Sequence, residues 1–198
     1  GVTALAVPER LGGDGVGLAE ITAALTEIGR HGTVSPALMT LGATAVLLDL
    51  ADDAQQDRYL AGVGQGSVLS PALSEPGRPL PEHPGVALAD GKLTGTKVAV
   101  GYAQQADWLL VTTDSGVVIV PAGADGVNAA KTPASNGSDE YVVTFDGVTV
   151  DGADVLAGAS VTRVNQLVLA VTGALAAGLV AGALRLTADY VATREQFG

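Results

Sequence analysis

The sequence predicts an α+β fold with an N-terminal helical domain, a central antiparallel β-barrel domain and the start of a C-terminal helical bundle. The hydrophobic periodicity supports this prediction, because it changes twice along the chain. Apolar residues recur at helical spacing up to about residue 66, alternate at strand spacing to about Ala157, and return to helical spacing beyond Val161. We therefore expect three units with the bounds 1–66, 67–158 and 159–198.

The first unit begins with a loop and a helix. Gly12-Gly13-Asp14-Gly15 forms the loop, after a short apolar entry closed by Pro8. The helix is indicated by apolar residues spaced three and four apart, which are Leu18, Ile21, Leu25 and Ile28. Gly29 and Gly32 are expected to end it.

Two further helices are expected before the strands begin. Ser35-Pro36 fits an N-cap followed by proline at the first helical position, so the second helix should run from Pro36 to about Leu50. Asp52 or Asp53 caps a third helix, which stops near residues 62–66.

Turn signals divide the central unit into short strands. Asp90-Gly91 is a two-residue hairpin turn, and Asp114-Ser115-Gly116 is a second turn. The expected strands are Val68–Leu73, Val86–Leu88, Lys92–Thr94, Lys97–Tyr102, Trp108–Thr113, Val117–Val120 and Tyr141–Val150. Strands and turns at this spacing are typical of a small antiparallel barrel or sandwich.

The last segment is helical and nearly uncharged from Val161 to Tyr190. Within it, Leu167–Leu184 contains Thr172 as its only polar residue, so by length it is a candidate membrane span. Gly178 and Gly182 give it a small-xxx-small pattern that lets helices approach closely. The alternative is a buried helix in a soluble bundle.

Composition excludes several classes of function. The net charge is −11 and the ten basic residues are scattered, so binding to nucleic acid is disfavoured. The chain has no cysteine, which rules out disulfides, thiolate catalysis and Cys-based zinc sites and fits a cytoplasmic protein. His31 and His83 are isolated and lack metal-ligand spacing, so no metal site is expected. Because the chain starts at Gly1 without Met and stops directly after a helical pattern, we expect it to be part of a longer protein.

Four stretches carry motifs that occur in the same order in one known family. Leu5–Gly13 reads LAVPERLGG and is similar to a "VPEEYGG" loop; Ala72–Gly77 reads ALSEPG and is similar to a "TEPG" flavin loop. Asn136–Leu156 is similar to a closing strand, and Tyr190–Gly198 reads YVATREQFG, similar to an "RxQFG" helix end. Together they resemble the acyl-CoA dehydrogenases. The resemblance covers essentially the whole chain, but only about the first half of a typical member.

The resemblance implies a helical domain, a β-barrel domain and a four-helix domain, in agreement with the order of the periodic segments. It implies that Leu167–Leu184 is the core helix of the second bundle rather than a membrane anchor. The greatest similarity is to a subunit type of the actinobacterial heteromeric steroid side-chain acyl-CoA dehydrogenases. In those enzymes two unlike subunits assemble with fewer complete flavin sites than subunits.

The implied reaction is α,β-dehydrogenation of an acyl-CoA thioester. A carboxylate removes the α-proton while the β-hydrogen leaves as hydride to FAD. The family's base is usually a Glu in a C-terminal region that this chain lacks, and in some members it lies at the start of the last predicted helix. No acidic residue lies between Asp154 and Asp189. The matching positions hold Asn165, Gln166 and Val168. We therefore assign no catalytic residue in this chain.

Cofactor contacts carry over in part. The resemblance implies that Leu73, Ser74 and Gly77 of the flavin loop and Gly101 of a later strand bind FAD within the subunit. It implies that Arg194, Gln196 and Phe197 reach the cofactor of a neighbouring subunit, where an arginine suits a pyrophosphate. The alternatives are an ordinary turn hydroxyl for Ser74, a helix C-terminal cation for Arg194 and a core residue for Phe197.

Two departures from the family pattern lie on the same flavin face. The small residues and the Ser that usually follow "EPG" are replaced by Arg78-Pro79-Leu80-Pro81. The family's "WIT" strand is replaced by Ala99-Val100-Gly101, which removes an aromatic wall and a hydroxyl. The sequence therefore predicts that the flavin pocket of this subunit is incomplete.

The sequence thus predicts a subunit of an FAD-dependent acyl-CoA dehydrogenase for a bulky acyl-CoA substrate, possessing no complete active site of its own. Its partner would be a second, unlike dehydrogenase subunit or another copy of itself. The alternatives are a structural or regulatory subunit without a redox role, and a membrane protein anchored by Leu167–Leu184.

Overall fold

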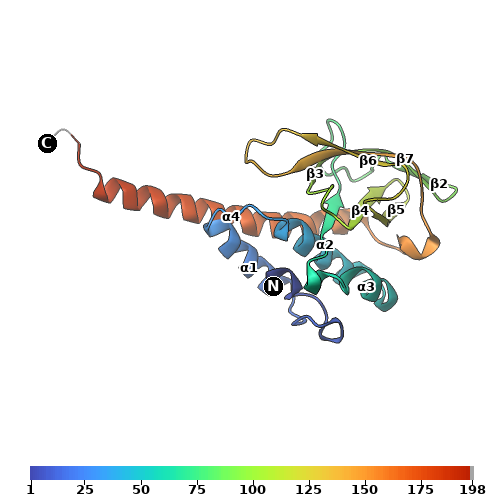
Figure 1. Cartoon of the computed structure of the whole chain (residues 1–198), viewed down its shortest axis with the longest axis horizontal. Coiled ribbons are helices and arrows are strands. Elements are labelled where there is room, and N and C mark those ends of the chain that lie inside the picture. The colour runs from blue at the N-terminus through green and yellow to red at the C-terminus, as the bar shows by residue number, and fades with distance from the viewer. Residues whose placement is uncertain (197–198) are drawn as a thin grey trace.

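The computed structural model of the chain describes residues 1–196 and confirms the predicted order of helical, sheet and helical parts (Figure 1). Within residues 1–66 the α-helices are α1 (Leu18–Arg30), α2 (Ala37–Leu50) and α3 (Asp53–Leu60). Short 3₁₀ turns lie at Val2–Ala4, Glu9–Leu11 and Val63–Gln65.

Capping explains where these helices start. Asp52 caps α3: its carboxylate accepts a hydrogen bond from the Gln55 N–H at 2.8 Å, and the Gln55 side chain accepts one from the Asp52 N–H at 3.3 Å. At α1, the Glu20 carboxylate accepts from the Gly17 N–H at 3.1 Å. The cap of α2 lies at Pro36, one residue later than predicted.

Two four-stranded sheets form the central part. In one sheet the order is β1 (Leu69–Ala72), β4 (Trp108–Thr113), β5 (Gly116–Pro121) and β8 (Val155–Leu156). In the other it is β2 (Ala87–Ala89), β3 (Lys92–Gly101), β7 (Glu140–Thr149) and β6 (Val127–Thr132). Neighbouring strands are antiparallel except β1 and β4, which run parallel and depart from the antiparallel expectation.

One core lies between the two sheets and another between the first sheet and the helices. Leu109 and Val111 of β4 face Val143 and Phe145 of β7 in the core between the sheets. On the opposite face of β4, Leu110 packs with residues of α2, α3 and the last helix. Because the first sheet is buried on both faces, its strands are almost continuously apolar instead of alternating.

The last helix, α4 (Val161–Thr193), begins at Ser160, whose hydroxyl accepts a hydrogen bond from the Arg163 N–H at 3.4 Å. Arg163 also donates two hydrogen bonds, each of 2.8 Å, to the Asp49 carboxylate and so ties α4 to α2. Figure 1 shows α1 alongside α4 and the two sheets near the N-terminal end of α4.

The glycines of α4 serve its contact with α1. A Cβ added at Gly178 would lie 1.9 Å from the carbonyl oxygen of Thr26, and one at Gly182 would lie 2.2 Å from that of Arg30. A Cβ at Gly29, in the last turn of α1, would lie 2.2 Å from the Leu175 carbonyl oxygen. The helix ends at Arg30, between Gly29 and Gly32 as predicted, and Gly32 adopts a left-handed φ of 62°. The small-residue pattern therefore packs two helices of the same chain.

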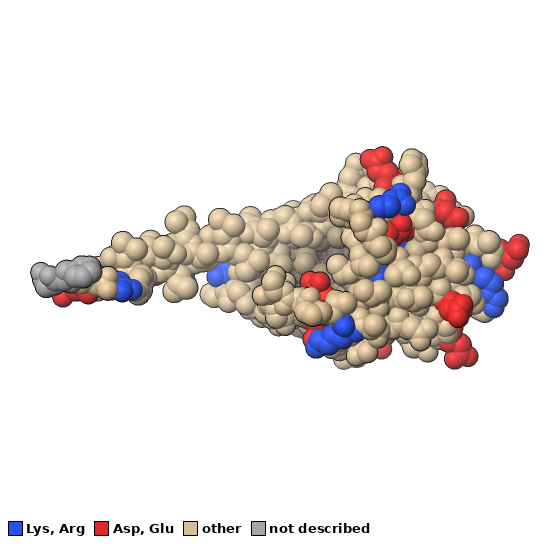
Figure 2. Space-filling view, turned by 90° about the horizontal axis from the view of Figure 1, so that it is seen from above, with Lys and Arg blue, Asp and Glu red and all other residues tan. Residues whose placement is uncertain are grey.

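Beyond this contact, α4 extends away from the rest of the chain with an exposed apolar surface. Val180, Leu184, Leu186 and Val191 are all more than half exposed. In Figure 2 the protruding helix is almost free of charged residues until its end. By length and composition alone, α4 is long and apolar enough to cross a membrane.

Candidate functional site

The turn that follows β1 is built around a buried carboxylate. Both oxygens of Glu75 accept hydrogen bonds from the Gly85 N–H at 2.9 Å, and Oε1 accepts another from the Val86 N–H at 3.1 Å. Arg78 donates to Oε2 at 3.3 Å. These bonds fold residues 75–86 into a closed loop, so Glu75 has a structural role.

Lys97 of β3 completes this arrangement from inside the sandwich. Its side chain is fully buried, and Nζ donates to the Leu73 carbonyl, to Glu75 Oε1 and to Thr112 Oγ1, each at 3.0 Å. All three protons of the ammonium are therefore used. The pair fixes the predicted flavin loop against strands β3 and β4.

The ionisation of both groups follows from burial and pairing. Burial alone would raise the pKa of Glu75, but the hydrogen bonds from Gly85, Lys97 and Val86 outweigh it and hold that pKa below its usual value. Burial lowers the pKa of Lys97, and the neighbouring Glu75 carboxylate partly offsets this effect.

A cavity of about 330 Å³ lies where the helical part, the second sheet and α4 meet. The α1–α2 connection and the start of α2 contribute Val34, Leu38 and Met39, and α4 contributes Leu175 and Leu179. The remaining wall comes from the end of β3 and from residues 136–140, which lead into β7. A mainly apolar cavity with a few polar groups is the usual form of a small-molecule site.

The wall contributed by β3 is almost bare backbone. The register between β3 and β7 is irregular between Lys97 and Val100, and Ala99 there adopts a left-handed φ of 54°. At Gly101 an added Cβ would lie 2.9 Å from the Sδ of Met39, so the thioether occupies the space of a side chain. The space left by the missing side chain at Gly101 is therefore occupied by the side chain of Met39 from α2.

The predicted site residues of the flavin loop lie beside this wall. Leu73 is buried, and the Ser74 carbonyl accepts a hydrogen bond from the Val98 N–H at 2.9 Å, which ties the loop to β3. Gly77 is exposed at the tip of the turn, with a φ of 70° that suits glycine. Gly101 lines the cavity itself.

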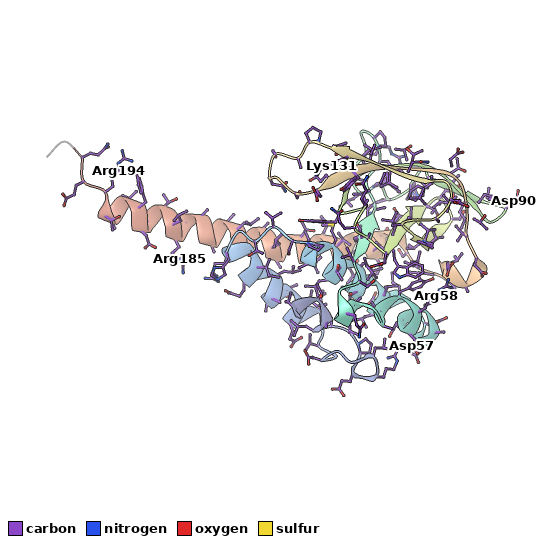
Figure 3. All side chains as sticks on the ribbon, in the orientation of Figure 1. Asp57, Arg58, Asp90, Lys131, Arg185 and Arg194 are labelled. Atoms are coloured by element: carbon purple, nitrogen blue, oxygen red, sulfur yellow. The ribbon has the colours of Figure 1, made fainter. Side chains whose placement is uncertain are left out.

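The second predicted group lies far from the first. Figure 3 places Arg194 just beyond the end of α4, remote from the sheets. Its guanidinium lies 5.0 Å from the ring centre of Tyr190. Gln196 is exposed, and Phe197 lies outside the described residues. The structure of this chain does not bring Arg194 and Gln196 together with Leu73, Ser74, Gly77 and Gly101.

The replacement loop Arg78–Pro81 docks on the first turns of α4. Asn165 Nδ2 donates to the carbonyls of Leu80 at 3.2 Å and Pro81 at 3.5 Å. Leu80 adopts a left-handed φ of 46°, and its side chain packs against the core that contains Val164 and Leu167. Asn165, at one of the positions matching the base of some family members, therefore binds this chain's own loop.

The cavity does not fit a complete flavin dinucleotide within this chain. Among the described residues that line it there is no Lys, Arg or His to pair with a pyrophosphate, and Glu140 is the only charged residue. The β3 wall offers no hydroxyl at 101 and no aromatic ring at 99. The lining of the cavity therefore does not support a flavin held by this chain alone.

Met39, Tyr102 and Glu140 are residues of the cavity that the sequence reasoning missed. The Tyr102 N–H donates to the Asp139 carbonyl at 2.7 Å, and burial together with the Asp139 charge raises the pKa of its hydroxyl. Glu140 lies at the cavity because β7 pairs with β3 and places it opposite Gly101. The sequence around Glu140 predicts a strand but does not indicate this position.

A second cluster at the opposite end of the first sheet has a structural role. The buried Tyr59 hydroxyl donates to Asp154 Oδ1 at 2.5 Å, and Arg58 pairs with the same carboxylate at 2.6 Å. Burial and the hydrogen bond to Asp154 raise the pKa of Tyr59. Trp108 packs edge-on against Tyr59 with ring centres 5.0 Å apart, and Arg58, which is labelled in Figure 3, lies over both rings.

Comparisons with known proteins find relatives of this chain both by sequence and by fold. Residues 1–67 match the sequence model described as "Acyl-CoA dehydrogenase, N-terminal domain". The whole chain is 65% identical to the acyl-CoA dehydrogenase FadE28 of Mycobacterium tuberculosis and covers 59% of that protein. The chain thus spans little more than half the length of this curated relative.

Two solved structures are similar over nearly the whole chain. The ChsE4-ChsE5 complex from Mycobacterium tuberculosis has a TM-score of 0.86 and 30% identity, covering 99% of this chain and 56% of that chain. A variant of the Tcur3481-Tcur3483 steroid ACAD has a TM-score of 0.90 and 32% identity, covering 100% of this chain and 56% of that chain.

Proposed function

Since the chain belongs to the acyl-CoA dehydrogenase family, we propose that it forms one subunit of an FAD-dependent heteromer that dehydrogenates a bulky acyl-CoA thioester. The proposed reaction removes hydrogens from the α and β carbons of the acyl group. A steroid side chain is the proposed acyl group, because a similar structure is described as a steroid ACAD. The proposed location is the cytoplasm.

The proposal of an unlike partner is supported by the similar structures: one is described as the ChsE4-ChsE5 complex, and the description of the other names two components, Tcur3481 and Tcur3483. The main support for an incomplete flavin site in this subunit is the wall formed by residues 99–101 of β3, where backbone is exposed and Met39 occupies the space of a side chain. In addition, no carboxylate occurs on α4 before Asp189. We propose that the catalytic base and a complete flavin cradle belong to the partner or to a part of the polypeptide beyond this sequence.

The proposed contribution of this chain to the cofactor comes from its last residues. Arg194, Gln196 and Phe197 would reach the FAD of the partner, with the guanidinium of Arg194 pairing with the pyrophosphate. The position of Arg194 beyond the free end of α4 supports this role, because a neighbouring subunit can approach it there. Leu73, Ser74, Gly77 and Gly101 would form the residual cradle in this subunit.

The test is a flavin count on the full-length protein purified alone and co-expressed with an unlike dehydrogenase subunit. We expect bound flavin and acyl-CoA-dependent reduction of an electron acceptor only in the complex. Arg194→Ala should lower the flavin per complex, whereas Arg185→Ala, which changes an exposed arginine within α4, should not. Full flavin content and activity in the protein alone would refute the proposed division.

The same purified samples distinguish two alternative functions of the chain. An unchanged flavin content in the Arg194→Ala complex would favour a structural subunit without a redox role. Sedimentation of the untreated protein with membranes would favour an anchor formed by α4, which has the length and hydropathy of a span.

A further inference from the structure

The charge of the cavity between β3, α2 and α4 limits the kind of ligand that it can bind. Among the described residues that line it, Glu140 is the only one with a charged side chain. Phosphate and carboxylate groups find no cation there and would face a carboxylate. A ligand in this cavity must therefore be neutral or cationic over the part that enters it.

The register of the second sheet directs Glu140 into the cavity. Glu140 of β7 is paired with Gly101 of β3, and side chains of directly paired residues share one face of a sheet. On that face, the Cβ position of Gly101 points at Met39 of α2. The neighbouring pair, Val100 with Tyr141, faces the opposite way into the core between the sheets.

Glu140 is the charged hydrogen-bond acceptor of the cavity that remains free for a ligand. Within residues 1–196, its side chain makes no hydrogen bond or salt bridge; the hydroxyls of Thr33 and Tyr102 and the Asn136 Nδ2 group also line the cavity without a protein partner. By contrast, the Ser138 hydroxyl donates to Asn136 Oδ1 at 2.6 Å, and the Ser35 hydroxyl accepts from the Ala37 N–H at 3.4 Å. A half-buried carboxylate without a partner is a strong acceptor for a hydroxyl donor.

We propose that this cavity binds an apolar ring-shaped group with a hydroxyl at its inner end, and that Glu140 selects the hydroxyl by accepting its hydrogen bond. Leu38, Met39, Leu175 and Leu179 surround the apolar body, and the bare backbone at 99–101 lets a flat ring approach β3. The ring-shaped body rests on the proposed function; the preference for a hydroxyl rests on Glu140 alone.

The experiment measures equilibrium binding of two CoA-free probes, trans-2-decalol and trans-2-decalone, to the full-length protein by calorimetry. We expect the alcohol to bind at least about tenfold more tightly than the ketone, which is the lower end for a hydrogen bond to a charged group. Glu140→Gln should bring the two affinities close together, because an amide can also donate to the ketone. The matched control Glu82→Gln, on an exposed loop, should keep the full preference.

A variant at the opening of the cavity tests whether the two probes bind there. Val34 is 61% exposed and lines the cavity, so Val34→Trp should weaken both probes without disturbing the core. Equal binding of alcohol and ketone to the unmodified protein, a preference that survives Glu140→Gln, or unchanged binding in Val34→Trp would each overturn the inference. Dehydrogenation by the complex, assayed in parallel, tests the proposed function separately, so either can fail while the other stands.

Discussion

The ammonium of Lys97 lies 3.0 Å from the carboxylate of Glu75, and both side chains are buried between strands. The two residues come from the turn after β1 and from β3, so their contact fixes the loop that contains Leu73, Ser74 and Gly77. Each charge is also satisfied by further hydrogen bonds. Removal of either partner would leave the other charged, buried and incompletely paired.

Lys97→Met is expected to destabilise the protein by about 3–5 kcal/mol, because it leaves the Glu75 carboxylate buried without its main counter-charge. Chemical denaturation of the full-length protein measures this loss. Lys92→Met is the control, since Lys92 lies on the same strand but is exposed and bonds only to the Thr149 hydroxyl. Similar losses in the two variants would contradict the role assigned to the pair.

The stabilising effect of ionised Glu75 is expected to disappear in acid. The folded-state pKa of Glu75 lies below its unfolded value of about 4.3, so its contribution is fully present above that pH and is lost as the pH falls through the folded-state value. The unfolding free energies of the native protein and of Glu75→Gln should differ most at neutral pH and converge below about pH 4. A difference that stays constant down to pH 3 would refute this assignment.

Tyr59→Phe is expected to cost about 1–3 kcal/mol, because it removes a short hydrogen bond to the nearly buried Asp154 carboxylate. Tyr141→Phe is a matched control: that tyrosine is as deeply buried, but its hydroxyl makes only a 3.4 Å contact with Gln105. Thermal unfolding of both variants gives the comparison. A larger loss in Tyr141→Phe than in Tyr59→Phe would show that the Asp154 contact does not matter.

Gly178→Ala and Gly173→Ala should act in opposite directions although both glycines lie inside α4. The new methyl group at 178 would lie 1.9 Å from the Thr26 carbonyl oxygen and must push α1 away, whereas the one at 173 meets no atom within 4 Å. We expect Gly173→Ala to stabilise the helix by up to about 1 kcal/mol. Gly178→Ala should lower the melting temperature, and equal effects of the two variants would argue against the close α1–α4 contact.

The order of the units and most element bounds could be predicted from the sequence, because they follow from periodicity and capping within a few residues of each position. Asp52 with Gln55 and Asp90 with Gly91 act locally, and both α3 and the β2–β3 hairpin lie where they were expected. Strand β6 was missed because it lies at a sheet edge and is only half buried, so its sequence neither alternates nor forms an apolar run.

The sequence by itself determined the helix–sheet–helix order, the family motifs and the absence of an aromatic ring and a hydroxyl at residues 99–101. Only the tertiary structure decided that Met39 fills that gap, that Gly178 packs against α1 instead of a partner helix, and that Asn165 holds the Arg78–Pro81 loop. It also decided that Glu140, opposite Gly101, faces the cavity. The physical reason is that these contacts join residues far apart in the chain, whose approach is set by strand register and helix packing, which local propensity does not encode.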